Sequence, residues 1–187
     1  MTPQPLPDDL QYCIPLCRAQ FKCPFIREEF AMKKTVLAAV AALVTLVPAA
    51  AYAIDVSETM DSALSAAAVW TKVGDFCGIA KWHPAVKNCT LSQKDGATFR
   101  LLDLGDKASV LEKLVSRDEA KRSYTYMIVE GVLPVQNYTS TISIAEAGAG
   151  SKLTWVGKFD AKGAPDADAA KVISGVYKAG LAPLAAK

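Results

Sequence analysis

Hydrophobic and polar residues alternate with a period of two over much of the chain, a pattern typical of strands with one buried face. Glycine-containing turn signals, such as Gly96, Gly105-Asp106 and Gly148, separate these segments. Because most of the connections are short, we expect the strands to be antiparallel neighbours. The predicted strands span residues 54–60, 87–93, 98–104, 109–116, 122–129, 138–146 and 152–160.

A helical period of three and four residues replaces this alternation in two places. At 66–73 the apolar face consists of Ala66, Val69, Trp70 and Val73, preceded by Ser62 or Ser65 as the capping residue. A short second helix is predicted at 79–82. After the acidic pair Asp166 and Asp168, a long helix is predicted, in which Pro183 bends or ends the last turn. Its apolar stripe is Ala169, Val172, Ile173, Val176, Tyr177, Leu181 and Leu184.

The predicted order is therefore one strand, two short helices, six antiparallel strands and one long helix. This order defines an α+β domain in which a long amphipathic helix packs across a curved sheet. The space between helix and sheet is either filled by side chains or left open.

Residues 32–53 have the pattern of a secretory signal peptide, with two lysines, a short apolar run and the sequence Ala51-Tyr52-Ala53. The run is shorter than the roughly 20 residues that a membrane span needs. We therefore expect cleavage after Ala53, a periplasmic or secreted location, and no stable membrane anchor. The mature domain is predicted at 54–187. Residues 1–31 are interpreted as a mis-annotated extension, with translation starting at Met32.

Charges of both signs are interspersed, and 21 basic against 19 acidic side chains give a formal net charge of +2. This weak charge gives no reason to expect nucleic acid or anionic lipid as a partner. The sequence also contains no recognisable cofactor motif, and no cofactor is expected.

The segment at 75–89, DFCGIAKWHPAVKNC, places the only histidine of the chain between Cys77 and Cys89. Two cysteines in an exported domain favour a single disulfide. A zinc site is the alternative, but each gap to His83 is five residues, the fourth ligand is missing, and no metal is expected. His83 is interpreted as part of a structural corner, because a residue before proline avoids helical geometry. A role in acid–base catalysis is the alternative.

The order of elements, with Val69-Trp70, Trp82-His83-Pro84 and Gly175-Val176-Tyr177, resembles the helix-grip superfamily (START/Bet v 1-like, SRPBCC). This superfamily includes the polyketide cyclase/dehydrase and lipid-transport proteins. The resemblance covers nearly all of the mature chain. It implies that the seven predicted strands form a curved sheet wrapped around the C-terminal helix, with a cavity for an apolar small molecule between them.

Three segments resemble the plant abscisic acid receptors: Val86-Lys87-Asn88-Cys89, Glu112-Lys113-Leu114 and Asn137-Tyr138-Thr139-Ser140. The resemblance implies that Lys87 meets an acid group of the ligand and that Glu112 orders water. Gly105-Asp106-Lys107-Ala108 and Leu133-Pro134 depart from the gating loop and latch of these receptors, so neither a plant hormone nor a phosphatase partner is expected. The predicted ligand-binding residues are Lys87, Arg100, Leu102, Leu104, Val110, Glu112, Tyr126, Ile128, Tyr138, Ser140, Val172, Val176 and Gly180.

The pattern of the strand at 109–116 also bears on Glu112. Val110, Glu112 and Leu114 share one face, whereas Lys113 and Arg117 are predicted on the opposite, solvent-facing side. An inward carboxylate is unfavourable unless it is paired, and Lys87 or Arg100 is the candidate partner.

The export signal and the fold also resemble the MxaD-type periplasmic proteins of methanol-oxidising bacteria, which implies assistance to methanol dehydrogenase and its cytochrome. Three functions follow, and binding of an apolar small molecule is preferred. The second is docking on a periplasmic dehydrogenase or cytochrome through an exposed loop at 133–135. The third is catalysis of the polyketide cyclase/dehydratase type, with Glu112 or His83 as acid/base and Lys87 or Arg100 stabilising an enolate. It ranks below binding because no nucleophile–base signature is present.

Overall fold

The computed structural model describes residues 53–185. The predicted extension at 1–31 and nearly all of the predicted leader at 32–53 lie outside the described residues. Within 53–185, no helix combines the length and apolar character that crossing a membrane requires.

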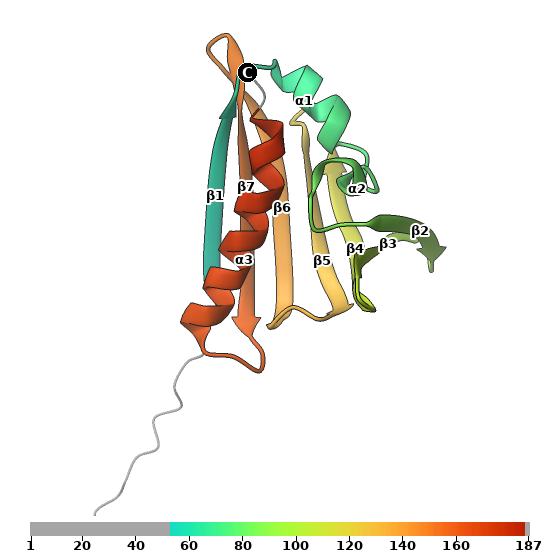
Figure 1. The fold of residues 1–187 in the computed structure, drawn as a ribbon. Coiled ribbons are helices and arrows are strands. Elements are labelled where there is room, and N and C mark those ends of the chain that lie inside the picture. The colour runs from blue at the N-terminus through green and yellow to red at the C-terminus, as the bar shows by residue number, and fades with distance from the viewer. Residues whose placement is uncertain (1–52, 186–187) are drawn as a thin grey trace, which may run out of the picture. The chain divides into compact units, whose positions relative to one another are not determined.

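Seven strands form one antiparallel sheet in the order β1-β7-β6-β5-β4-β3-β2 (Figure 1). Every strand predicted from the alternating pattern is present, and most extend further than predicted. The first and last strands are neighbours, and β1 forms one edge of the sheet beside β7. The strands are β1 (Ile54–Ser62), β2 (Asn88–Lys94), β3 (Ala97–Gly105), β4 (Ala108–Asp118), β5 (Ser123–Gly131), β6 (Val135–Ala147) and β7 (Gly150–Ala161).

The helices lie against one face of this sheet, with the long helix running along β1, β7 and β6 (Figure 1). They are α1 (Ala66–Val73), α2 (Ile79–Trp82) and α3 (Asp166–Leu181), followed by the 3₁₀ turn η1 (Ala182–Leu184). Ser65, not Ser62, caps α1, because its hydroxyl accepts a hydrogen bond from the Ala68 N–H at 3.3 Å. Pro183 lies in η1, where α3 has already ended. The predicted α+β arrangement is therefore confirmed.

The core lies between the sheet and α3. Trp155 of β7 stacks on Tyr177 of α3 with their ring centroids 4.5 Å apart. This packing requires a glycine on β7, because a Cβ atom at Gly157 would lie 2.0 Å from the Tyr177 hydroxyl oxygen. Val172 is 42% exposed, so its predicted place on the buried stripe of α3 is wrong. Gly180 takes part in that stripe instead.

A β-bulge on β4 changes which side chains face the helices. Leu114 pairs with Tyr126 and Ser116 with Thr125, so Val115 is the extra residue between them. Beyond the bulge Arg117 pairs with the buried Tyr124, and therefore lies on the helix side. Its guanidinium carbon lies 4.9 Å from the centroid of the Trp70 ring, and its Nη1 donates to the Gly74 carbonyl. The prediction that Arg117 shares a face with Lys113 is therefore wrong, although Arg117 remains exposed on the helix side.

Cys77 and Cys89 form the predicted disulfide, with their Cα atoms 5.5 Å apart. The bond joins the loop between α1 and α2 to the start of β2. It therefore closes the short segment that contains His83.

Candidate functional site

The hairpin of β3 and β4 places Arg100 directly opposite Glu112. Arg100 Nε lies 2.5 Å from Glu112 Oε2, and the two side chains are 0% and 6% exposed. The predicted inward carboxylate is thus paired, and Arg100 is its partner. Lys87, the other candidate, is exposed at the surface just before β2.

Aromatic rings surround the Arg100 guanidinium. Its central carbon lies 4.1 Å from the Phe76 ring centroid and 5.0 Å from that of Tyr126, and its Nη1 donates to the Phe76 carbonyl. Burial alone would lower the pKa of Arg100, but the Glu112 carboxylate and nearby tyrosines raise it above its usual range. Arg100 therefore carries a fixed positive charge inside the core.

Burial raises the pKa of Glu112 above its ordinary value, while the charge and hydrogen bond of Arg100 oppose that shift. Among residues 53–185, only Arg100 is found bonded to this carboxylate, through Oε2. Glu112 also lines a cavity, as described next, and no hydrogen bond to its Oε1 is found among residues 53–185.

A cavity of about 70 Å³ lies between the sheet and α3. Its wall is mainly apolar, and its polar contributions come from Glu112, His83, Tyr126 and Tyr138. The remaining lining residues are Ile79, Ala85, Val86, Leu102, Leu104, Val110, Ile128, Leu133, Trp155, Ile173 and Val176. One internal water needs at least about 10–15 Å³ of cavity volume. The cavity is therefore large enough for about five waters or for one small organic molecule.

The structure brings most of the predicted ligand-binding residues together around this cavity. Those in its wall are Leu102, Leu104, Val110, Glu112, Tyr126, Ile128, Tyr138 and Val176. Arg100, Ser140 and Gly180 are buried but are not among the lining residues. Lys87 and Val172 are exposed and lie outside the lining, which differs from their expected placement. Whether any of these residues binds a ligand stays a prediction.

A cluster of hydroxyl groups fixes the tyrosines of the wall. The Tyr138 hydroxyl lies 2.5 Å from that of Tyr177, and the Trp155 Nε1–H donates to Tyr126 at 3.1 Å and to Ser140 at 2.9 Å. Burial raises the pKa of Tyr177 to about 12 and holds the pKa values of Tyr126 and Tyr138 well above 10.0. These hydroxyls therefore stay protonated and can donate hydrogen bonds at neutral pH.

Both ring nitrogens of His83 are bonded to the backbone. Nδ1 accepts from the Ala85 N–H at 3.2 Å, and Nε2 lies 3.1 Å from the Val176 carbonyl oxygen. These partners fit the neutral ring with its proton on Nε2. His83 is also the residue that ends α2, with extended backbone angles. This geometry supports the structural corner and leaves neither nitrogen available as a proton shuttle.

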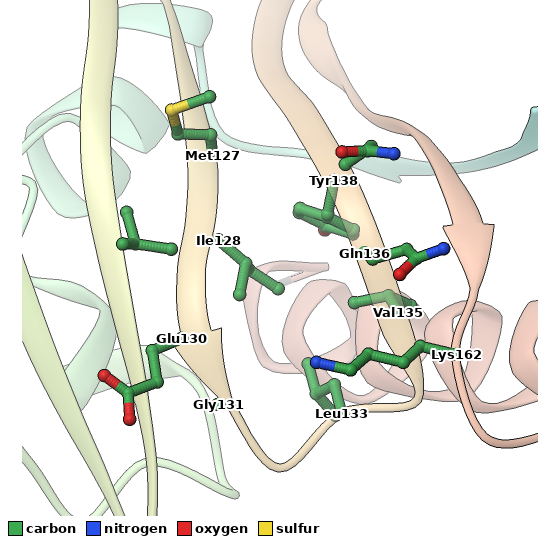
Figure 2. A pocket seen from close by; sticks show the side chains of 11 residues that line it. Met127, Ile128, Glu130, Gly131, Leu133, Val135, Gln136, Tyr138 and Lys162 are labelled. Carbon is green, nitrogen blue, oxygen red and sulfur yellow. The ribbon is translucent and has the colours of Figure 1, made fainter.

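A cleft of about 480 Å³ lies beside the cavity, between the ends of β5 and β6 (Figure 2). Ile128, Leu133 and Tyr138 line both spaces. The loop at 133–135 was expected to be exposed, but Val135 is buried and Leu133 packs against the core. Val132, which is 60% exposed, is the apolar residue of this loop that faces solvent.

Sequence reasoning did not identify Trp155, Ile173 or Leu133 as cavity residues. Trp155 could have been found, because Leu153, Trp155 and Phe159 alternate along a predicted strand. The pairing of Arg100 with Glu112 could not be counted outward from the turn, because a register shift between Asp103 and Gly105 displaces the alignment of the two strands by one residue. Among residues 53–185, no three His, Cys, Asp or Glu side chains are arranged to hold a metal ion.

Comparisons with known proteins agree with this architecture. Residues 53–187 match the family described as polyketide cyclase / dehydrase and lipid transport. The protein XoxI from Bacillus cereus is 30% identical, with a TM-score of 0.66 over 70% of this chain and 92% of that chain. A Thermobifida fusca protein is 29% identical, with a TM-score of 0.63 over 70% and 90%.

The structure of Ara h 8.0201 is 23% identical, with a TM-score of 0.53 over 68% of this chain and 94% of that chain, and shows the shared fold alone. No curated protein gave a significant match.

Proposed function

The chain belongs to the polyketide cyclase / dehydrase and lipid transport family, and from this we propose that it binds a small, largely apolar molecule in the cavity between the sheet and α3. The observation that carries the proposal is Glu112, a carboxylate in an otherwise mainly apolar wall. Apolar pockets with a few convergent polar groups are typical of small-molecule sites.

The chemistry of Glu112 selects the polar group of the ligand. Arg100 holds one carboxylate oxygen from behind, and the other can accept a hydrogen bond from the cavity. A hydroxyl or amide N–H satisfies that oxygen, whereas an acid group placed beside it would be repelled. This replaces the expectation of an acid group at Lys87, because Lys87 is exposed and lies outside the cavity wall.

The size of the cavity limits the ligand. Sites for drug-sized molecules occupy roughly 300–1,000 Å³. The cavity of about 70 Å³ accommodates only a group such as one aromatic ring, because Trp155, Tyr177 and Arg100 fill the space around it. A larger ligand must place the rest of its structure outside the cavity.

Phenol and toluene test the proposal because they have the same shape and differ in one hydrogen-bond donor. We expect phenol to bind more tightly than toluene, and benzoate to bind least, as followed by amide chemical shifts during titration. Val176→Phe, which fills the cavity, should abolish binding of phenol. Val172→Phe, one turn away on the exposed side of α3, is the matched control and should bind normally. The proposal would be refuted if benzoate bound more tightly than phenol and toluene, or if Val176→Phe and Val172→Phe lost phenol binding equally.

We also propose that the protein is exported. The signal-peptide pattern at 32–53 supports this, as does the Cys77–Cys89 disulfide, since such bonds persist mainly in oxidising compartments. Fractionation of the host cells followed by N-terminal sequencing tests it. The expected result is a periplasmic protein that begins at Ile54, and a cytoplasmic protein retaining residues 32–53 would contradict the proposal.

A second candidate function is assistance to a periplasmic dehydrogenase or its cytochrome, supported by the resemblance of the sequence to MxaD-type proteins. Pull-down from periplasmic extract with the tagged protein tests this candidate. Recovery of a dehydrogenase or cytochrome that the tag alone does not retain would support it, and recovery of neither would count against it. For the cyclase/dehydratase alternative, Glu112 is the better candidate acid/base, because both nitrogens of His83 are engaged although its ring also lines the cavity.

A further inference from the structure

The sheet separates between β5 and β6 at one end. Pairing of the two strands stops at Met127 and Thr139, although β5 continues to Gly131 and β6 begins at Val135. Each strand keeps its other neighbour in this region, because Gly131 pairs with Val110 of β4 and Val135 with Ala161 of β7. The result is a gap within an otherwise continuous sheet, and it forms the cleft of about 480 Å³.

The local backbone explains why the strands diverge. Asn137 adopts a left-handed conformation with φ of 52°, and the register between β6 and β7 shifts between Gln136 and Thr139. Such an irregularity bends a strand away from its partner. The loop that follows β5 is held in place by the Lys162 N–H, which donates to the Pro134 carbonyl at 3.0 Å.

Apolar side chains separate the cleft from the cavity. Ile128 points into the gap between the strands, with Tyr138 on the facing strand and Leu133 below (Figure 2). These three residues line both spaces. Because no backbone ladder crosses the gap here, contacts of these side chains are the main barrier between cleft and cavity.

Polar side chains line the cleft, those of Glu130, Gln136, Asn137 and Lys162, and Lys162 is its cation. The Glu130 side chain extends from β5 away from Lys162 (Figure 2). The Lys162 side chain extends across the gap in front of Leu133 (Figure 2). Among the ion pairs of residues 53–185, none involves Lys162. Its ammonium group is thus available to an anionic group held in the cleft.

We propose that the cleft is the outer half of the ligand site and that the ligand is an amphipathic acid. Its carboxylate binds Lys162 in the cleft, and its apolar part passes between Ile128, Leu133 and Tyr138 into the cavity, where a donor group meets Glu112. This inference rests on the proposed function and deepens it. It places the acidic group of the ligand outside the cavity, away from the Glu112 carboxylate, and beside Lys162 and not beside Glu130 on the other side of the cleft.

The probe 3-(4-hydroxyphenyl)propionate, which is phenol with a short carboxylate arm, tests this proposal on the purified protein. We expect it to bind about tenfold more tightly than phenol, as one charge-assisted contact allows. Its amide analogue should show less of this gain. Lys162→Gln should remove the gain, and Lys158→Gln, a change of an exposed lysine on β7 outside the cleft, should preserve it.

The outcomes separate this inference from the proposed function. If phenol binds but the propionate binds no more tightly, the cleft does not hold the acid group and the inference fails while the cavity proposal stands. Equal effects of Lys162→Gln and Lys158→Gln would also overturn it, since they would indicate a general charge effect. If neither phenol nor the propionate binds, the proposed function fails and the inference fails with it.

Discussion

The Nε2 atom of His83 lies 3.1 Å from the carbonyl oxygen of Val176, so the corner after α2 is bonded to the backbone of α3. The imidazole also meets Trp155 edge to face, with ring centroids 6.1 Å apart. His83 therefore joins three parts of the domain: the corner, the long helix and the sheet.

Replacement of Gly180 by alanine tests this close approach. A Cβ atom there would lie 2.5 Å from His83 Cδ2 and 2.8 Å from Trp155 Cζ3. We expect Gly180→Ala to lower the free energy of unfolding by about 1–3 kcal/mol, as overpacking does. Gly175→Ala is the matched control on the same helix, since its Cβ meets nothing within 4 Å, and should stabilise by about 1 kcal/mol. Urea denaturation measures both, and a stabilising Gly180→Ala would contradict the packing described.

The pH dependence of stability should depend on His83, the only histidine of the chain. Burial lowers its pKa below the ordinary 6.5, the hydrogen bond to Val176 opposes this, and the Arg100 charge adds to it. The unfolded chain therefore takes up the proton first as the pH falls. The neutral ring therefore contributes to the free energy of unfolding. This contribution is fully present above pH 6.5 and is lost as the pH falls from 6.5 through the folded-state pKa.

Urea denaturation between pH 5 and 8 of the wild type and of His83→Gln measures this contribution. The variant should be less stable at neutral pH and should lack the decline below pH 6.5. Glu112 acts in the opposite direction, because a carboxyl group with a raised pKa favours the folded state at lower pH. A decline of equal size in the variant would show that His83 is not its source.

The buried pair of Arg100 and Glu112 should be strongly coupled. Glu112→Gln leaves the guanidinium buried without its counter-charge, and we expect a loss of about 3–5 kcal/mol in unfolding free energy. The double change Arg100→Met with Glu112→Leu should lose much less, because no charge is then buried. Asp61→Asn, which removes the exposed partner of Lys152, is the control and should have little effect. A double variant that is no more stable than Glu112→Gln would contradict the coupling.

Removal of the disulfide should destabilise the domain, because the unfolded chain then gains conformational entropy. The bond spans a sequence separation of 12 residues, for which chain entropy gives roughly 3 kcal/mol. We expect the double variant Cys77→Ser with Cys89→Ser to lose roughly 3 kcal/mol of unfolding free energy in urea denaturation. Reductant should lower the unfolding free energy of the wild type to the same level. Reductant should leave the double variant unchanged, and a reductant-insensitive wild type would contradict the prediction.

The elements could be predicted from the sequence because period and turn residues are local properties. The helix at 66–73 and the short helix at 79–82 agree with α1 and α2, and all seven strands are present. The disulfide was also predictable, since the predicted domain at 54–187 contains two cysteines and hence one possible pairing.

Burial within a predicted element was less predictable. Val172 has the spacing of an apolar stripe but is exposed, because the packing of α3 on β1 and β7 decides which part of the stripe is covered. Arg117 has the strand position of a solvent-facing residue, but the extra residue Val115 reverses the alternation. No local signal for that bulge was recognised in the sequence.

The sequence by itself determined the order of elements, the inward carboxylate of Glu112 and the corner at His83, because each follows from residue types and their spacing. Tertiary structure alone decided that Arg100 and not Lys87 pairs with Glu112, since cross-strand register is a non-local property. It also decided how much of the interior stays open, because that volume depends on how Trp155, Tyr177 and α3 pack together. The gap between β5 and β6 has the same origin: the hydrogen bonds that hold each strand come from its neighbours and not from its own residues.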